Sequence, residues 1–156
     1  MTHFAPRWRT LLLATALCGA MAGANALVNP PIRMTAQGIE YMCGGSGAPE
    51  AAFMDMVAPQ WAAHFEFAMN QASGRTAAAG VKVRVRNNYT GEMNFEAFSD
   101  SPTMLARLAP GSYTVEATLD GLTLIAPLSV VAGRSALAQF VWPSNLSTPV
   151  QTQAAL

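Results

Sequence analysis

The chain has 156 residues, and its nine basic side chains balance nine acidic ones. This length suits one ordinary domain that can bury a core of its own. Because the chain is close to neutral and has no basic amphipathic helix, neither nucleic acid nor a membrane surface is an expected partner.

The N-terminal segment has the pattern of an export signal. Arg7 and Arg9 precede an apolar run over residues 11–23, and the small-x-small sequence Ala-Asn-Ala that a signal peptidase cuts comes next. The run is shorter than the roughly 20 residues that a membrane-spanning helix needs. We therefore expect residues 1–26 to be a signal peptide cleaved after Ala26, and the mature protein to be periplasmic, with no transmembrane segment.

The two cysteines fall on either side of that cleavage point. Cys18 lies inside the expected signal peptide and, as an alternative, could carry a lipid anchor. A lipoprotein signal has a small residue directly before the cysteine, whereas Leu17 precedes Cys18, so cleavage after Ala26 explains more of the pattern. The mature chain then holds only Cys43, so no internal disulfide can form and the thiol is either free or links two chains as a dimer.

Residues 27–60 predict an extended lead-in followed by one short helix. The first part, residues 27–47, is interrupted by prolines and glycines and is expected to hold little regular structure. A helix is expected over residues 49–57, where Pro49 suits the first turn and Glu50 lies near the positive helix end. Three apolar side chains share one face at helical spacing: Phe53, Met54 and Val57.

From residue 61 the apolar period changes to two, which predicts a half-buried strand over residues 61–69. The side chains expected on its buried face are Trp61, Ala63, Phe65, Phe67 and Met69. His64 and Glu66 point the other way, so His64 is expected to be an exposed strand residue. Residues 70–80 are polar and small and are expected to form a loop.

Residues 81–86 and 93–98 are expected to form a hairpin around a polar connection. A register that keeps the apolar side chains on one face pairs Val85 with Met93 and Val83 with Phe95. The same register forms two opposite-charge pairs, Arg86 with Glu92 and Lys82 with Glu96. The basic row Lys82, Arg84 and Arg86 could meet an acidic glycan or a membrane headgroup, but this pairing favours a solvated strand face.

A second hairpin is marked by Asp120-Gly121, a two-residue turn between apolar alternations. Four cross-strand pairs then share one face: Leu119 with Leu122, Ala117 with Leu124, Val115 with Ala126, and Tyr113 with Leu128. Pro127 cannot donate a ladder hydrogen bond, so the second strand is expected at a sheet edge or with a bulge. A last strand is expected over residues 136–142, and a disordered tail over residues 144–156.

The segment Leu105-Ala-Arg-Leu-Ala-Pro-Gly-Ser-Tyr-Thr-Val-Glu-Ala117 resembles the centre of carboxypeptidase regulatory-like domains, which are transthyretin-like (prealbumin-like) β-sandwiches. The matching positions are Leu108, Pro110, Gly111, Tyr113, Val115 and Ala117. The resemblance implies an all-β, seven-stranded Greek-key sandwich domain over residues 61–143, and the turn spacing also predicts about seven short strands. In such a domain Pro110-Gly111 turns between strands, and Tyr113 buries its ring and returns its hydroxyl to nearby backbone.

The segment around Cys43 resembles part of small exported bacterial proteins that carry this domain and are mostly uncharacterised. Cys43 precedes the expected helix, where a lowered pKa could make the thiol redox-reactive. No basic partner is visible in the sequence, however, which favours a buried small hydrophobic residue. Gly44, Gly45 and Gly47 could form an anion site before the helix, but the lysine of a P-loop is missing, which favours a flexible lead-in.

His64 is the one histidine that remains after cleavage. One histidine and one cysteine do not make a zinc site, and a Cys43–His64 nucleophile pair would need an orienting group and an oxyanion site that the sequence does not identify. Hydrolases of purine degradation share the transthyretin fold but rely on several histidines and a C-terminal Tyr-Arg-Gly-Ser, whereas this chain ends in Gln-Ala-Ala-Leu. We therefore expect no cofactor, no metal and no catalytic residue.

These patterns predict a non-enzymatic binding or interaction module of the periplasm, with a protein or glycan partner in the cell envelope. Two alternatives stay open. One is a thiol-dependent redox or disulfide-linked dimer protein that acts through Cys43, and the other is a hydrolase of unknown type.

Overall fold

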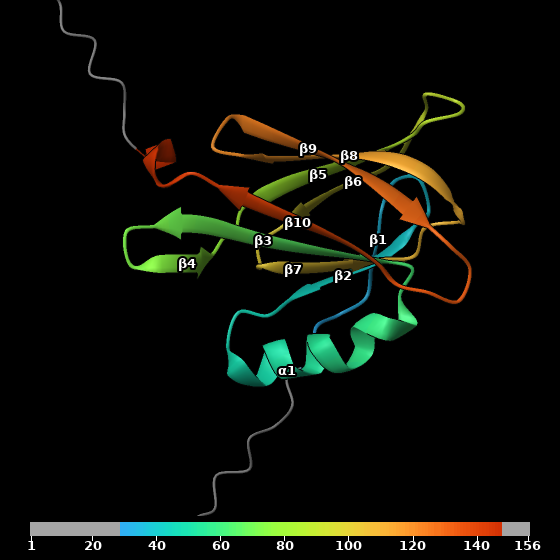
Figure 1. The fold of residues 1–156 in the computed structure, drawn as a ribbon. Coiled ribbons are helices and arrows are strands. Elements are labelled where there is room, and N and C mark those ends of the chain that lie inside the picture. The colour runs from blue at the N-terminus through green and yellow to red at the C-terminus, as the bar shows by residue number, and fades with distance from the viewer. Residues whose placement is uncertain (1–28, 148–156) are drawn as a thin grey trace, which may run out of the picture.

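The computed structural model of the protein describes residues 29–147, which form two packed β-sheets and one short α-helix (Figure 1). Across the first sheet the strands are β1 (Arg33–Met34), β2 (Glu40–Gly44), β7 (Thr103–Ala106), β3 (Ala63–Gln71) and β10 (Ala136–Trp142), with β4 (Gly74–Ala77) paired to β3. Across the second they are β6 (Met93–Ser99), β5 (Val81–Asn87), β8 (Gly111–Leu119) and β9 (Leu122–Val130). An all-β chain with one short helix is thus confirmed, although the described part has ten strands rather than about seven.

Three of these strands lie where the sequence predicts irregular structure. β1 and β2 belong to the lead-in, and β2 is an interior strand because β1 and β7 pair with its two sides. Gly44 ends β2, and Gly45 follows in the left-handed region (φ 94°), so the glycines terminate the strand rather than prevent it. β4 folds back on β3 inside the expected loop over residues 70–80. Both expectations were wrong, because strand pairing outweighs weak local propensity.

The expected short helix is confirmed as α1 (Ala48–Val57), which continues into a 3-10 turn, η1 (Ala58–Gln60). Pro49 lies in its first turn, and the Ser46 N–H donates to Oε2 of Glu50 (3.2 Å). The helix covers the outer face of the first sheet, on the side away from the second sheet (Figure 1). A small core under the helix consists of Met42, Met54, Ala58, Trp61 and Leu105, with Phe53 and Val57 packed against it.

The main core lies between the two sheets and follows the alternation along the strands. β3 and β10 pair in parallel, which sets Ala138 beside Phe65 and Phe140 beside Phe67. Phe67 and Phe140 stack with ring centroids 6.2 Å apart, and Trp142 completes the aromatic cluster. The buried face predicted for residues 61–69 is confirmed at Ala63, Phe65 and Phe67, whereas Met69 is only partly buried. The prediction was wrong for Trp61, which precedes β3 and packs in the small core under the helix.

The hairpin around Asp120-Gly121 is confirmed in its full register. β8 and β9 pair Leu119 with Leu122, Ala117 with Leu124, Val115 with Ala126 and Tyr113 with Leu128. Both turn residues have positive φ, 47° at Asp120 and 83° at Gly121, as a two-residue hairpin turn needs. β9 lies at the edge of its sheet, as Pro127 predicts.

The register predicted for the first hairpin was wrong by two residues. β5 and β6 pair Val85 with Phe95 and Val83 with Ala97. A slip of two keeps every side chain on its predicted face, so the alternation alone could not distinguish the two registers. A bulge between Val85 and Arg86 and a turn centred on Asn87, whose Oδ1 accepts from the Tyr89 N–H (2.8 Å), set the observed register.

This shift changes the charge pairs on the outer face of the second sheet. Glu96 lies opposite Arg84, and Oε2 accepts a hydrogen bond from its Nε (2.7 Å). The expected pair with Lys82 is also present, at 3.3 Å and on the diagonal. Arg86 instead donates to the Gly91 carbonyl (2.7 Å), so the expected Arg86–Glu92 pair does not form within the described residues.

The turn into β8 has the geometry that the sequence predicts for Pro110, Gly111 and Tyr113. The Tyr113 residue is 2% exposed, and its hydroxyl donates to the Ala109 carbonyl at 2.8 Å. A side chain at Gly111 would stand 3.3–3.4 Å from the tyrosine ring and hydroxyl, so the ring packs directly over the turn backbone. This contact ties the β7–β8 connection to the first residues of β8.

The last strand ends at Trp142, and the four residues after Pro143 form a 3-10 turn, η2 (Ser144–Ser147), where the sequence predicts disorder. The expected signal peptide, its cleavage site and the tail beyond residue 147 lie outside the described residues. Within residues 29–147, no helix has the length and apolar character needed to cross a membrane.

Candidate functional site

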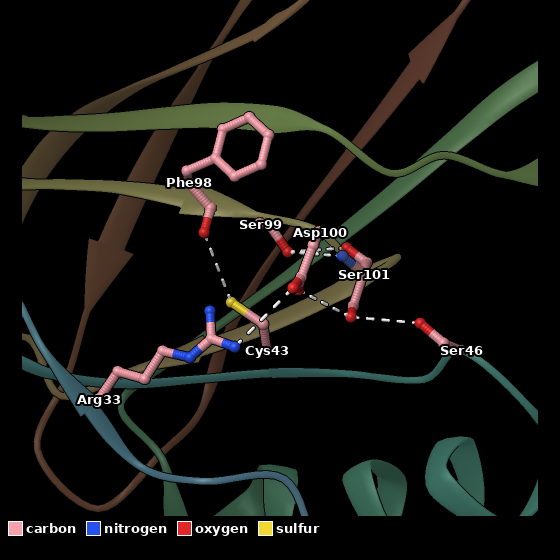
Figure 2. Close-up of polar contacts among 7 residues, drawn as sticks. All are labelled: Arg33, Cys43, Ser46, Phe98, Ser99, Asp100 and Ser101. Carbon is pink, nitrogen blue, oxygen red and sulfur yellow. Dashed lines mark hydrogen bonds and ion pairs between the residues drawn. The ribbon is translucent and has the colours of Figure 1, made fainter.

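Cys43 lies on β2 with its side chain directed between the two sheets, and the residue is 5% exposed (Figure 2). Its Sγ donates to the Phe98 carbonyl at 4.0 Å. The next carbonyl, that of Ser99, accepts from the Gly80 N–H on the β5 side (2.9 Å). Because successive backbone groups of a strand point to opposite sides, the Phe98 carbonyl faces the open edge of β6. The thiol therefore links β2 of one sheet to the edge of the other.

The surroundings of the thiol favour its protonated form. Burial raises the pKa of Cys43, and Asp100 adds to this, whereas a hydrogen bond with Ser99 and the charge of Arg33 act in the opposite direction. The two charges pair with each other at 3.8 Å, beside the sulfur in Figure 2. A reactive cysteine needs access and a lowered pKa, so these features favour a structural thiol.

The glycines after Cys43 serve close packing. A Cβ at Gly44 would lie 2.8 Å from Sδ of Met54 and 2.9 Å from Cγ of Pro30, so only glycine lets the helix approach β2 this closely. At the start of α1 the Glu50 carboxylate accepts a hydrogen bond from the Ser46 N–H, so a negative group of the chain itself already occupies the place where an external anion would bind. This arrangement favours a packing role for the glycine-rich segment over an anion site.

Cys43 and His64 do not form a pair. Across the first sheet Cys43 aligns with Met104, and His64 aligns with Leu105. Neighbouring residues on a strand point to opposite faces, and aligned residues share a face. The Cys43 side chain therefore faces the main core, while His64 faces the side that α1 covers.

His64 is not an exposed residue, contrary to the sequence-based expectation. Its side chain is 14% exposed, and its Nε2 lies 3.5 Å from Oε1 of Glu66. Burial lowers the pKa of His64, while the charges of Glu66 and Asp55 raise it. His64 lines a cavity of about 510 Å³ together with Asp55, Arg134 and Ser135. The periodicity of β3 predicts the face of His64 correctly, but it cannot show that helix and loop residues cover that face.

A second cavity opens where three connections meet at one end of the sandwich. It has a volume of about 520 Å³ and is lined by residues 59–62 before β3, residues 107–110 between β7 and β8, and residues 130–134, which comprise the end of β9 and part of its connection to β10. We call it the end pocket. Loops held at one end of a rigid sandwich are a common place for binding sites. The end pocket is the candidate functional site.

Arg107 lies at the wall of the end pocket, where its guanidinium contacts a carboxylate and an aromatic ring. Its Nε lies 2.7 Å from Oε2 of Glu40, and its Cζ lies 4.6 Å from the centroid of the Trp61 ring. A backbone hydrogen bond joins the same two residues, since the Arg107 N–H donates to the Glu40 carbonyl (3.0 Å). Contact with an aromatic face and an ion pair together restrict the guanidinium before any ligand arrives.

Arg134 supplies a second guanidinium from the β9–β10 connection. Gly133 has φ 76°, and the Arg134 N–H closes the turn on the Val131 carbonyl (3.2 Å). Arg134 lines the end pocket, the cavity beside His64 and a smaller cavity of about 260 Å³. Among residues 29–147 it has no carboxylate within ion-pair distance.

Neither arginine was identified from the sequence, although Arg107 lies inside the segment that carries the family resemblance. The basic row Lys82, Arg84 and Arg86 is only partly compensated: Arg84 and Lys82 share Glu96, and the Arg84 hydrogen bond lowers the pKa of Glu96. Arg86 has no carboxylate within ion-pair distance among the described residues and donates to the Gly91 carbonyl instead. In the part of the chain that the structure describes, no group of three or more histidine, cysteine or acidic residues is placed to hold a metal ion.

No protein-family model matches this chain, and neither does any curated protein. Function therefore has to be inferred from the residues themselves and from the geometry of the end pocket.

Proposed function

We propose that the protein is an exported, non-enzymatic binding module of the periplasm that takes a protein or glycan partner of the cell envelope at its end pocket. The observation that carries this proposal is the guanidinium of Arg107, which contacts both Glu40 and the Trp61 ring where three connections meet. Side chains that are ordered before binding lose less entropy when a ligand arrives. A packed sandwich supplies the rigid support that such a site needs.

The fold supports the resemblance to carboxypeptidase regulatory-like domains. Eight of the ten strands, β3 to β10, lie between residues 61 and 143; without the short β4, seven remain, with three in one sheet and four in the other. We propose that these seven form the Greek-key sandwich of that family, and that β1, β2 and β4 are additions. The buried Tyr113, bonded to the Ala109 carbonyl, supports this assignment. Fold alone does not carry function, so the binding role rests on the pocket.

Export is tested by expressing the full chain in a Gram-negative host and fractionating the cells. We expect a periplasmic protein whose N-terminal sequence starts at Leu27, and an Ala26→Asp variant that stays uncleaved because the small-x-small pattern is lost. An uncleaved wild-type protein in the cytoplasm would contradict export.

Binding is tested by titrating the purified protein with defined envelope glycans and envelope proteins. Saturable binding that weakens in Arg107→Ala but not in Arg75→Ala is expected. Arg75 is a matched control because β4 pairs with the far end of β3, at Asn70. If none of the glycans and none of the envelope proteins binds saturably, the proposed function is contradicted.

A hydrolase stays the second candidate because Asp55, His64 and Ser135 line one cavity. Serine, histidine and aspartate are the residue types of a nucleophile, a base and an orienting acid, respectively. No hydrogen bond joins any two of them in the described structure, and the ion contact of His64 is to Glu66, so we place this candidate behind binding. Ester hydrolysis that is lost in both His64→Ala and Ser135→Ala would reverse that order.

A further inference from the structure

The charge of the end pocket indicates the chemical class of its ligand. Thirteen residues line the pocket, and the charged ones among them are Arg107 and Arg134. Glu40 pairs with Arg107 but is not among the residues that line the pocket. A ligand in the pocket therefore meets two guanidinium groups and no carboxylate of the lining.

The two arginines differ in the contacts that their side chains make with the rest of the protein. Arg107 is pinned through Nε by Glu40 and supported by the Trp61 ring, yet its side chain stays 53% exposed and reachable. The ion pair uses Nε, and no hydrogen bond from its terminal nitrogens to another described residue is present. A guanidinium presents its terminal nitrogens as a fork that matches the two oxygens of a carboxylate or phosphate. Arg107 can therefore orient such a group.

Arg134 adds charge that is not already compensated. Glu40 offsets much of the charge of Arg107, whereas Arg134 has no ion-pair partner in the described part of the chain. Asp55 and His64 border Arg134 from the neighbouring cavity and reduce its field on that side. On the side of the end pocket Arg134 faces no acid of the lining, so it supplies most of the attraction for an anion.

The rest of the lining limits the size and the polarity of the uncharged part of the ligand. Polar and apolar surface contribute about equally to the wall, and the apolar part includes Pro110 and Val131 together with the edges of the buried Trp61, Leu108 and Val130. A volume of about 520 Å³ lies in the range of sites for small organic molecules. A bare inorganic ion would leave this apolar surface uncovered.

We propose that the end pocket binds a small organic oxyanion, either a carboxylate or a phosphate ester on a compact body, whose charged group lies between Arg107 and Arg134. This deepens the proposed function and rests on it only for the location of the site. Arg134 provides the net charge, and Arg107 provides the orientation.

The purified protein is titrated calorimetrically, at low ionic strength, with glucuronate and with glycerol 3-phosphate, which represent the two kinds of oxyanion. Glucose and glycerol serve as neutral analogues of the same size. We expect at least one acid to bind saturably below about 10 mM, and we expect neither neutral analogue to do so. Amide shifts in NMR spectra should change at residues 107–110 and 131–134. The preferred acid identifies the oxyanion.

The decisive variants are Arg134→Gln and the matched control Arg75→Gln. Because a charge-assisted bond to an anion contributes roughly 1.5–3 kcal/mol, Arg134→Gln should weaken binding about 10- to 100-fold, while Arg75→Gln should leave it unchanged. Arg134→Lys should recover part of the affinity, which separates charge from fork geometry.

Equal binding of acids and neutral analogues, an unchanged affinity in Arg134→Gln, or no saturable binding of either acid would each overturn this inference. The proposed function would survive those results if an envelope protein or glycan still bound with weaker affinity in Arg107→Ala. Conversely, acid binding by a protein that stays in the cytoplasm would support the site and contradict export.

Discussion

The hydroxyl of Tyr113 donates to the carbonyl of Ala109, four residues earlier in the chain, at 2.8 Å. The bond closes the β7–β8 connection over the start of β8, next to the wall of the end pocket to which Ala109 belongs. Burial raises the pKa of Tyr113, so the phenol stays a donor throughout the neutral range.

Tyr113→Phe should lower the free energy of unfolding by about 1 kcal/mol, because it removes this hydrogen bond and leaves the ring packing intact. Urea unfolding followed by tryptophan fluorescence measures the change. Tyr89→Phe is the control, since Tyr89 is 88% exposed at a hairpin tip and its loss of a hydroxyl should have no measurable effect. Equal midpoints for Tyr113→Phe and wild type would contradict the structural role of the bond.

Gly44→Ala should destabilise the protein by about 1–3 kcal/mol, because the new methyl group would overlap Met54 and Pro30. The helix would have to move away from β2, or the Met54 side chain would have to leave its buried position. The effect should be smaller in a Met54→Ala background, where the sulfur is absent. A double-mutant cycle in urea measures this coupling, and strictly additive effects would show that the contact is not what limits the substitution.

The Cys43 thiol should be unreactive in the folded protein. In a Cys18→Ser background, where Cys43 is the single thiol, iodoacetamide should label the native protein much more slowly than the urea-unfolded one, because burial limits access and raises the pKa. Non-reducing gels should show a monomer. Fast native labelling, or a dimer that disappears in Cys43→Ser, would favour the thiol-dependent alternative over the binding module.

Stability should fall in mild acid because of His64. Burial lowers the pKa of His64, so the unfolded chain takes up a proton more readily than the folded protein. The loss therefore begins as the pH falls below the unfolded histidine value of about 6.5 and ends below the lowered folded value. His64→Gln should flatten the decline of the unfolding free energy over this window, measured by urea titration at each pH.

Glu66 and Asp55 oppose the effect of burial on His64, and they provide an internal check. Removing the nearer charge with Glu66→Gln should steepen the pH dependence, because the protonated imidazole then lacks its carboxylate at 3.5 Å. Identical slopes for wild type, His64→Gln and Glu66→Gln would mean that other groups cause the acid sensitivity.

Local pattern was sufficient for the elements whose pairing partner is next to them in the chain. The Asp120-Gly121 turn and the alternation on either side of it predicted the whole register of β8 and β9. The register predicted for the first hairpin was wrong because its longer connection forms a bulge and a turn at Asn87. The alternation of apolar and polar residues carries no information about either feature. The predicted face of each strand nevertheless held, because a two-residue slip preserves it.

Distant pairing was not predictable in the same way. β2 joins β7 across about sixty residues, through contacts such as Cys43 with Met104, and β10 joins β3 in parallel across more than seventy. Neither segment carries a local signal for its partner. The burial of His64 and the end pocket both follow from these pairings and from the position of α1, so the sequence-based interpretation placed neither.

The sequence determined which apolar side chains of β3, β5 and β8 face the main core, where α1 begins and, through the family resemblance, how Tyr113 closes on its own turn. Those features depend on alternation and on contacts within a few residues, where the cost of closing the chain is small. Only the tertiary structure decided that β2 lies inside a sheet, that Cys43 and His64 face opposite sides of it, and that Arg107 and Arg134 share one pocket. Those features depend on the order of strands across the sheets, which is set by the total packing of the core rather than by any single segment.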